Sequence, residues 1–65
     1  MKRWICAKRD FGESPAVDAF LADIIKVCEA HGLWLGHEDS QGGFLVEEES
    51  TRDWINSASD NRRKA

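Results

Sequence analysis

The sequence has few of the features that mark a secreted or membrane-spanning protein. Its 65 residues include only two cysteines, Cys6 and Cys28, whereas secreted domains of this size usually carry four or more. No apolar run approaches the ~20 residues that cross a bilayer, and the apolar stretch after Arg3 is too short for a signal peptide. We therefore expect a soluble, cytoplasmic protein whose two thiols stay reduced.

The sequence also lacks the common motifs of metal and nucleotide sites. There is no C-x-x-C pair, no H-E-x-x-H helix motif and no G-x-x-x-x-G-K-[S/T] loop. The formal net charge of −3 argues against general nucleic-acid binding, which normally needs a basic patch or stripe. We expect no metal, no cofactor and no membrane partner.

The length and composition predict one small globular domain. With 42% hydrophobic and 32% charged residues, the chain is globular rather than disordered. We expect a single α+β domain over residues 1–60 and a flexible basic tail over residues 61–65. Because a core of this size rarely supplies more than about 3–5 kcal/mol, an additional stabilising element such as an oligomer interface is expected.

The clearest element is an amphipathic helix over residues 15–31. Ser14 is a good N-cap residue, Pro15 suits the first helical position, and Gly32 allows a left-handed turn at the end. The apolar residues between them follow the helical period and predict one broad buried stripe. These residues are Val17, Phe20, Leu21, Ile24, Ile25, Val27 and Cys28.

Two short extended runs, residues 33–39 and 44–48, predict a hairpin around a glycine-bearing loop. Alternation favours a register in which Leu35 lies opposite Val46 and His37 lies opposite Phe44, since a one-residue slip would place Leu35 opposite a glutamate. This register puts Leu35, Val46 and Phe44 under the helix. It puts Trp34, Gly36 and Leu45 on the other face.

Two further elements complete a predicted β-α-β-β-α order. Residues 2–7 form a first strand that Asp10-Phe11-Gly12 ends, and Ser50 caps a second, short helix containing Trp54. The prediction is a three-stranded, largely antiparallel sheet with the long helix on one face. The favoured strand order is 1-3-2, and the alternative places strand 1 beside strand 2.

The sheet face away from the long helix carries large apolar residues. Trp34 and Leu45 point there, and exposed apolar patches on small proteins usually mark an interface. We therefore predict a homo-oligomer, a dimer formed through the Trp34/Leu45 face. The alternative is that the second helix folds back and Trp54 covers Trp34.

The densest polar cluster is His37-Glu38-Asp39. His37 could act as a base that Asp39 orients, but a complete active site inside one 65-residue protomer is not expected. The alternative for His37 is a structural histidine, half-buried at the helix-facing rim and bonded to Asp39 or to a backbone carbonyl. We expect a binding protein rather than an enzyme.

A ligand site can be assembled around this cluster. Gly42 and Gly43 fit hairpin-turn chemistry, and their bare backbone N–H groups could also approach an anion. Nearby cations would receive phosphates while a tryptophan stacks on a base. The candidate ligand-binding residues are His37, Asp39, Gly42, Gly43, Phe44, Trp34, Arg3 and Trp54.

The segment from Val27 to Glu47, followed by Trp54, resembles a family of small uncharacterised phage and prophage proteins. The shared pattern is roughly V-C-x-x-H-G-x-x-[I/L]-x-H-E-D-x-x-G-x-F-x-[I/V]-E, and the resemblance covers about residues 20–58. The H-E-D-x-x-G-x-F part is the unusual portion. The chain departs from the pattern at Gly36, where the family tends to carry serine, and at residues 53–55, where the family has Glu-Trp-Leu.

The resemblance implies an accessory phage protein in the bacterial host cytoplasm that counters host defence. The first expectation is a small homo-oligomer that sequesters a nucleotide-type immune signal in a shared pocket. The alternative is an inhibitor that binds a host defence protein through the Trp34 face or the acidic edge at residues 47–49. A second alternative is a small phosphoesterase-like enzyme that uses His37.

Overall fold

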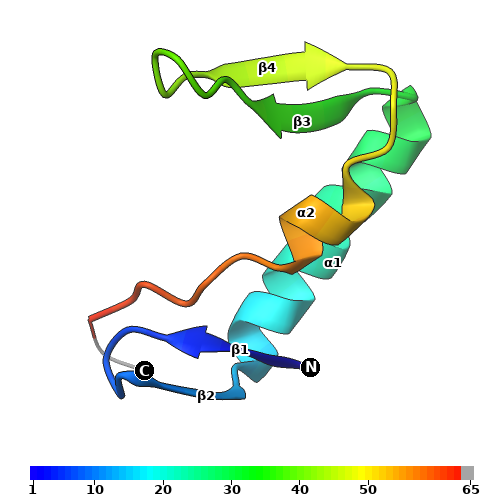
Figure 1. The fold of residues 1–65 in the computed structure, drawn as a ribbon. Coiled ribbons are helices and arrows are strands. Elements are labelled where there is room, and N and C mark those ends of the chain that lie inside the picture. Colours follow the sequence, from blue (N-terminus) through cyan, green and yellow to red (C-terminus); the bar gives the residue numbers. More distant parts are fainter. Residues whose placement is uncertain (64–65) are drawn as a thin grey trace.

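The computed structural model describes residues 1–63 and consists of two hairpins at opposite ends of a long helix. Figure 1 shows hairpin β1–β2 at the beginning of α1, hairpin β3–β4 at its end, and the short helix α2 against its middle. No helix in the described part of the chain is long and apolar enough to cross a membrane. The elements are β1 (Lys2–Ile5), β2 (Asp10–Glu13), α1 (Pro15–His31), β3 (Trp34–His37), β4 (Phe44–Glu47) and α2 (Arg52–Asn56).

The predicted three-stranded sheet is wrong. Each strand pairs antiparallel with its neighbour in the chain, which gives two separate two-stranded sheets and neither of the predicted strand orders. The reason is that β2 takes one edge of β1. A helix of 17 residues, about 25 Å long at 1.5 Å per residue, then carries the chain away from β1 before β3 begins.

The missed strand β2 contains the residues that were expected to end β1. Trp4 lies opposite Phe11, and their rings meet edge to face with centroids 5.3 Å apart. Such cross-strand aromatic pairs stabilise short hairpins. The connecting turn over residues 6–9 places Arg9 at φ 51°, the left-handed region that non-glycine residues seldom adopt.

The predicted helix is confirmed over Pro15–His31, with Pro15 in its first turn and Gly32 at φ 66° after its end. Ser14 does not cap it with its side chain. Its hydroxyl instead donates a 2.8 Å hydrogen bond to Asp60 near the end of the chain. Ser14 therefore links the helix start to the C-terminal segment rather than to the first turn.

The register of hairpin β3–β4 is confirmed, and Leu35 packs against the core as predicted, but the predicted placement of Trp34, Val46 and Phe44 is wrong. Leu35 lies opposite Val46 and His37 opposite Phe44, as alternation requires. Trp34, however, is only 8% exposed, whereas Phe44 and Val46 are exposed. The core of the described residues consists of Leu21, Ile25, Cys28, Trp34 and Ile55.

Helix α2 is shorter than expected and lacks the predicted cap. It covers Arg52–Asn56, and the side-chain oxygen of Ser50 accepts only a 3.3 Å hydrogen bond from the Arg52 amide. The Thr51 hydroxyl fixes the start of the helix to β3, because it donates a 2.5 Å hydrogen bond to the Leu35 carbonyl oxygen. The helix folds back toward β3, as the alternative predicted, but Ile55 and not Trp54 enters the core beside Trp34.

The segment after α2 joins the edge of β1 through Asp60. The Asp60 amide donates to the Trp4 carbonyl and the Cys6 amide donates to the Asp60 carbonyl, both at 2.8 Å. The Asp60 carboxylate is buried and also accepts hydrogen bonds from Arg62 at 2.8 and 2.9 Å. Of the expected tail over residues 61–65, the structure describes residues 61–63, in which Arg62 bonds Asp60. Residues 64–65 lie outside the described residues.

This buried carboxylate predicts a loss of stability in acid. The Arg62 guanidinium and the Ser14 hydroxyl hold the pKa of Asp60 well below its usual range. A carboxyl whose pKa is lower in the folded state contributes stability that is fully present above its unfolded pKa, about 3.9, and declines as the pH falls further. We expect Asp60→Asn to be less stable than wild type at pH 7 and to lose less stability between pH 4 and pH 2. Urea titrations across that pH range measure both effects, and Ser14→Ala should shift them in the same direction but less.

Candidate interaction site

Six of the eight candidate site residues meet at the end of hairpin β3–β4, in the hairpin tip (residues 37–44) and the adjacent Trp54. His37 Nδ1 lies 3.0 Å from Asp39 Oδ1, and the Asp39 side chain is 98% exposed. Phe44 pairs with His37 across the strands and is 78% exposed. His37 is therefore an open histidine bonded to Asp39.

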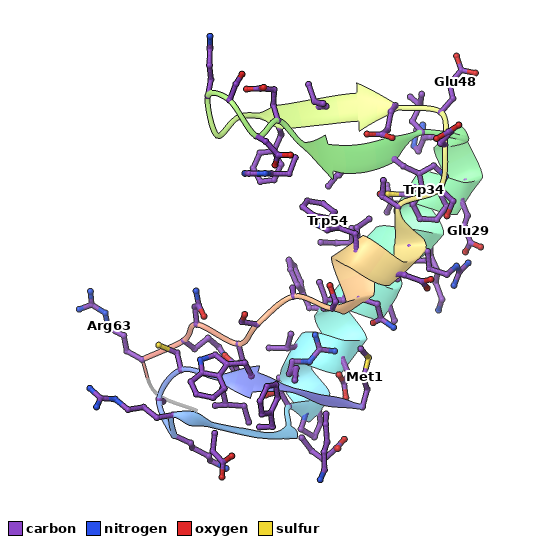
Figure 2. The ribbon with its side chains drawn as sticks, viewed as in Figure 1. Met1, Glu29, Trp34, Glu48, Trp54 and Arg63 are labelled. Atoms are coloured by element: carbon purple, nitrogen blue, oxygen red, sulfur yellow. The ribbon has the colours of Figure 1, made fainter. Side chains whose placement is uncertain are left out.

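Trp54 extends this surface from α2. Its ring centroid lies 6.3 Å from that of His37 with the planes tilted by 32°, and its side chain is 46% exposed. Figure 2 shows Trp54 in the space between α2 and β3, whereas Trp34 lies where β3, α1 and α2 meet. The two tryptophans thus have different roles, since Trp54 is presented to solvent and Trp34 fills the core.

The loop within the tip is held by Glu38, which sequence reasoning missed. The carboxylate of Glu38 accepts hydrogen bonds from the Ser40 hydroxyl, the Ser40 amide at 2.8 Å and the Gln41 amide at 2.6 Å. These bonds lower the pKa of Glu38, with the Ser40 hydroxyl as the largest cause. No clear signal for this role is present in the sequence, because the side chains that commonly bond backbone amides two residues away are those of Ser, Thr, Asn and Asp.

One of the two glycine amides of the predicted anion site, that of Gly42, is already bonded within the loop. Gly42 adopts φ 72°, and its amide donates a 2.9 Å hydrogen bond to the Glu38 carbonyl oxygen. The Gly43 carbonyl accepts from the Glu38 amide at 2.8 Å. The Ser40 and Gln41 amides are bonded to the Glu38 carboxylate, so the negative charge that these loop amides bind is already supplied by the chain itself.

The role of Glu38 can be tested by hydrogen exchange. Glu38→Gln keeps the shape of the side chain but removes its charge, and charge-assisted bonds are roughly twice as strong as neutral ones. We expect the amides of Ser40 and Gln41 to exchange several-fold faster in this variant, as measured by NMR. Asp39→Asn is the matched control, because Asp39 bonds no loop amide among the described residues. Equal acceleration in both variants would contradict the assignment.

Arg3 and Trp34 do not belong to this surface. The Arg3 side chain is buried at the opposite end of α1, where its guanidinium pairs with Asp18 and donates to the carbonyl oxygens of Asn56 and Ala58 at 3.1 and 2.8 Å. Trp34 belongs to the core. Both residues are structural here, which corrects their predicted role in ligand binding.

Charge is strongly segregated along the molecule. Residues 33–51, which contain hairpin β3–β4, carry five carboxylates and no lysine or arginine. The carboxylates belong to Glu38, Asp39, Glu47, Glu48 and Glu49. The opposite end is mixed but net basic: it carries Lys2, Lys8, Arg9, Arg62 and Arg63 besides the buried Arg3, together with Asp10, Glu13, Asp18 and Asp60. The hairpin tip therefore lies in a field that repels phosphates and attracts cationic groups.

The described residues contain no group of three or more metal-ligating side chains. Cys28 is buried in the core, as the apolar pattern of the helix predicted, and Cys6 is exposed.

Comparisons with family models, curated proteins and solved structures find no match for this chain. The functional argument therefore depends on the geometry of the hairpin tip and Trp54.

Proposed function

We propose that this chain is a non-catalytic protein-binding module that uses the hairpin tip and Trp54 to dock on a basic surface of a partner protein. The observation that carries the proposal is the combination of two exposed aromatic side chains, Phe44 and Trp54, with a segment, residues 33–51, that holds five carboxylates and no lysine or arginine. Buried aromatic anchors supply most of the energy in protein interfaces, and charge complementarity selects the partner.

The rigidity of the tip supports this function. Glu38 holds the loop from inside, Gly42 provides the left-handed turn, and Asp39 bonds His37. A surface that is already ordered loses little conformational entropy on binding, so more of the contact energy remains as affinity. The resemblance of the His37-Glu38-Asp39 segment to phage proteins suggests a host defence protein as the partner, which this module would inhibit by occupying its basic surface.

A pull-down with matched variants tests the proposal. Tagged wild-type protein is incubated with host lysate and compared with a Phe44→Ala/Trp54→Ala double variant and with Phe11→Ala, an exposed phenylalanine at the opposite end. We expect a specific host protein to be retained by wild type and Phe11→Ala, lost with the double variant, and released by raising the salt concentration. Retention by all three proteins alike would reject the hairpin tip as the binding site.

The second candidate is sequestration of a nucleotide-type ligand. The tilted pair of His37 and Trp54, with Phe44 opposite His37, offers rings on which a base could stack. The five carboxylates and the absence of lysine and arginine from residues 33–51 weigh against a ligand with phosphates. Calorimetric titration with cyclic and ADP-ribose-type nucleotides separates the candidates. Saturable binding that Trp54→Ala abolishes would favour sequestration, and an altered nucleotide after incubation would favour the phosphoesterase alternative.

A further inference from the structure

Helix α1 has a second apolar stripe that the protomer covers only in part. At 100° per residue, the buried side chains of Leu21, Ile25 and Cys28 occupy one arc of the helix, and Val17, Phe20, Ile24 and Val27 occupy the neighbouring arc. Together they span roughly 160°, but Phe20 is 62% and Val27 60% exposed. Val17 and Ile24 pack partly against the core, so the outward-facing part of the stripe consists of Phe20 and Val27.

The exposed stripe connects two hollows that share Phe20. The first, of about 590 Å³, lies between α1 and hairpin β3–β4, with Leu35 and Val46 on its hairpin wall. The second, of about 330 Å³, lies between α1 and residues 58–62. The stripe is thus a shallow groove along α1, bounded at the helix start by the C-terminal segment and at the helix end by hairpin β3–β4.

The two ends of this groove carry opposite charge. Figure 2 shows Arg63 and Glu48 at opposite ends of the molecule. Lys8, Arg9 and Arg62 lie at the same end as Arg63, and Glu47 and Glu49 flank Glu48. A surface that is net basic at one end, apolar in the middle and acidic at the other end is complementary to a second copy of itself rotated by 180°.

We propose that the chain forms an antiparallel homodimer in which α1 packs against α1 of a second copy across this groove. A twofold axis near Ile24 places Phe20 against the partner's Val27, and it places the basic end of each protomer beside the partner's residues 47–49. A parallel arrangement would bring like charges together. The twofold interface uses the same surface on both protomers, as the commonest protein dimers do.

A dimer interface of standard size would cover a modest part of the protomer surface. A stable interface buries about 800 Å² per partner, which is roughly a sixth of the 5093 Å² surface of the described residues. The dimer also supplies the stabilising element that a core of five residues lacks. His37, Phe44 and Trp54 line neither hollow, so the hairpin tip stays accessible for the proposed function. This interface replaces the predicted Trp34/Leu45 face, since Trp34 is buried within the protomer.

The oligomeric state is the first test. Sedimentation equilibrium of the full chain is expected to give twice the 7.4 kDa protomer mass at tens of micromolar. Phe20→Glu and Val27→Glu should each give monomers with an unchanged circular dichroism spectrum, because both side chains are exposed in the protomer. Leu45→Gln, at an exposed site that lines neither hollow, should stay dimeric. A wild-type monomer at these concentrations, or a dimer that survives both groove substitutions, would overturn the proposal.

The orientation is tested by cross-linking in a Cys6→Ser background. Ala16 and His31 are exposed at opposite ends of the stripe. A short bismaleimide should join Ala16→Cys to His31→Cys when the two variants are mixed, and should not join two copies of Ala16→Cys. The reverse result would show a parallel dimer and overturn the arrangement. As a second check, reversing the charge at residues 47–49 should weaken the dimer, and combining this change with Lys8→Glu and Arg63→Glu should restore it.

Discussion

Replacing Trp34 with alanine is expected to leave most of the chain unfolded in water at neutral pH. Trp34 is 8% exposed and packs with Ile25, Cys28 and Ile55 at the junction of β3, α1 and α2. Truncating a buried tryptophan typically costs about 3–5 kcal/mol, from lost burial and from the cavity that remains. A core of this size supplies about 3–5 kcal/mol in total, so the substitution removes most of the free energy of unfolding.

Trp54→Ala is the matched control for this prediction. Trp54 is 46% exposed and contacts the ring of His37, so its removal should cost about 1 kcal/mol or less. Urea unfolding followed by circular dichroism compares the two variants directly. Similar midpoints for both, or a larger loss with Trp54→Ala, would show that Trp34 does not hold the core as described.

The contrast between the two tryptophans shows how far the sequence could predict the hairpin. Alternation correctly gave the register, because a slip would have placed Leu35 opposite a glutamate. The alternation of apolar and polar residues also predicts which side chains share a face of the hairpin, but it does not predict which face packs against the helix. That choice is made by tertiary packing: Trp34 is the largest apolar side chain of β3, and it fills the angle between α1 and α2 while Val46 remains exposed.

The missed strand has a similar cause. Residues 10–13 (Asp-Phe-Gly-Glu) combine two turn-forming residues with one aromatic, so their local propensity indicates the end of a strand. They form β2 because Phe11 packs on Trp4 across the hairpin and because Arg9 adopts the left-handed turn. Helix α1, by contrast, was predictable from its own sequence, since its apolar period and its terminal proline and glycine act locally.

The candidate site was predicted in part for the same reason. His37, Asp39 and Phe44 are neighbours in one hairpin, so local reasoning placed them together, and Trp54 joined them because α2 folds back toward β3. Arg3 was misplaced because its partners, Asp18 and the carbonyl groups of Asn56 and Ala58, are distant in sequence. A buried arginine of this kind gives no local signal.

Replacing Arg3 with alanine is expected to have an effect nearly as large as the loss of Trp34. The buried guanidinium pairs with Asp18 and bonds two carbonyl groups of the segment after α2, and it thereby joins β1, α1 and the C-terminal segment. Removing one partner of a buried ion pair costs about 3–5 kcal/mol, because the remaining charge is left without its counterion. Water reaches part of Asp18, which is 33% exposed, so we expect a cost of about 3 kcal/mol, at the lower end of that range.

Two further variants separate the hydrogen bonds of Arg3 from its charge. Arg3→Lys keeps the positive charge, but a single ammonium group cannot reproduce the planar fork that bonds Asp18 and both carbonyls. It should therefore recover only part of the lost stability. Arg52→Ala removes an arginine whose pair with Glu29 is exposed on both sides, and such pairs contribute about 0–1 kcal/mol. If urea midpoints fell equally for Arg3→Ala and Arg52→Ala, the stability would depend on net charge rather than on the buried network that fixes the C-terminal segment to hairpin β1–β2.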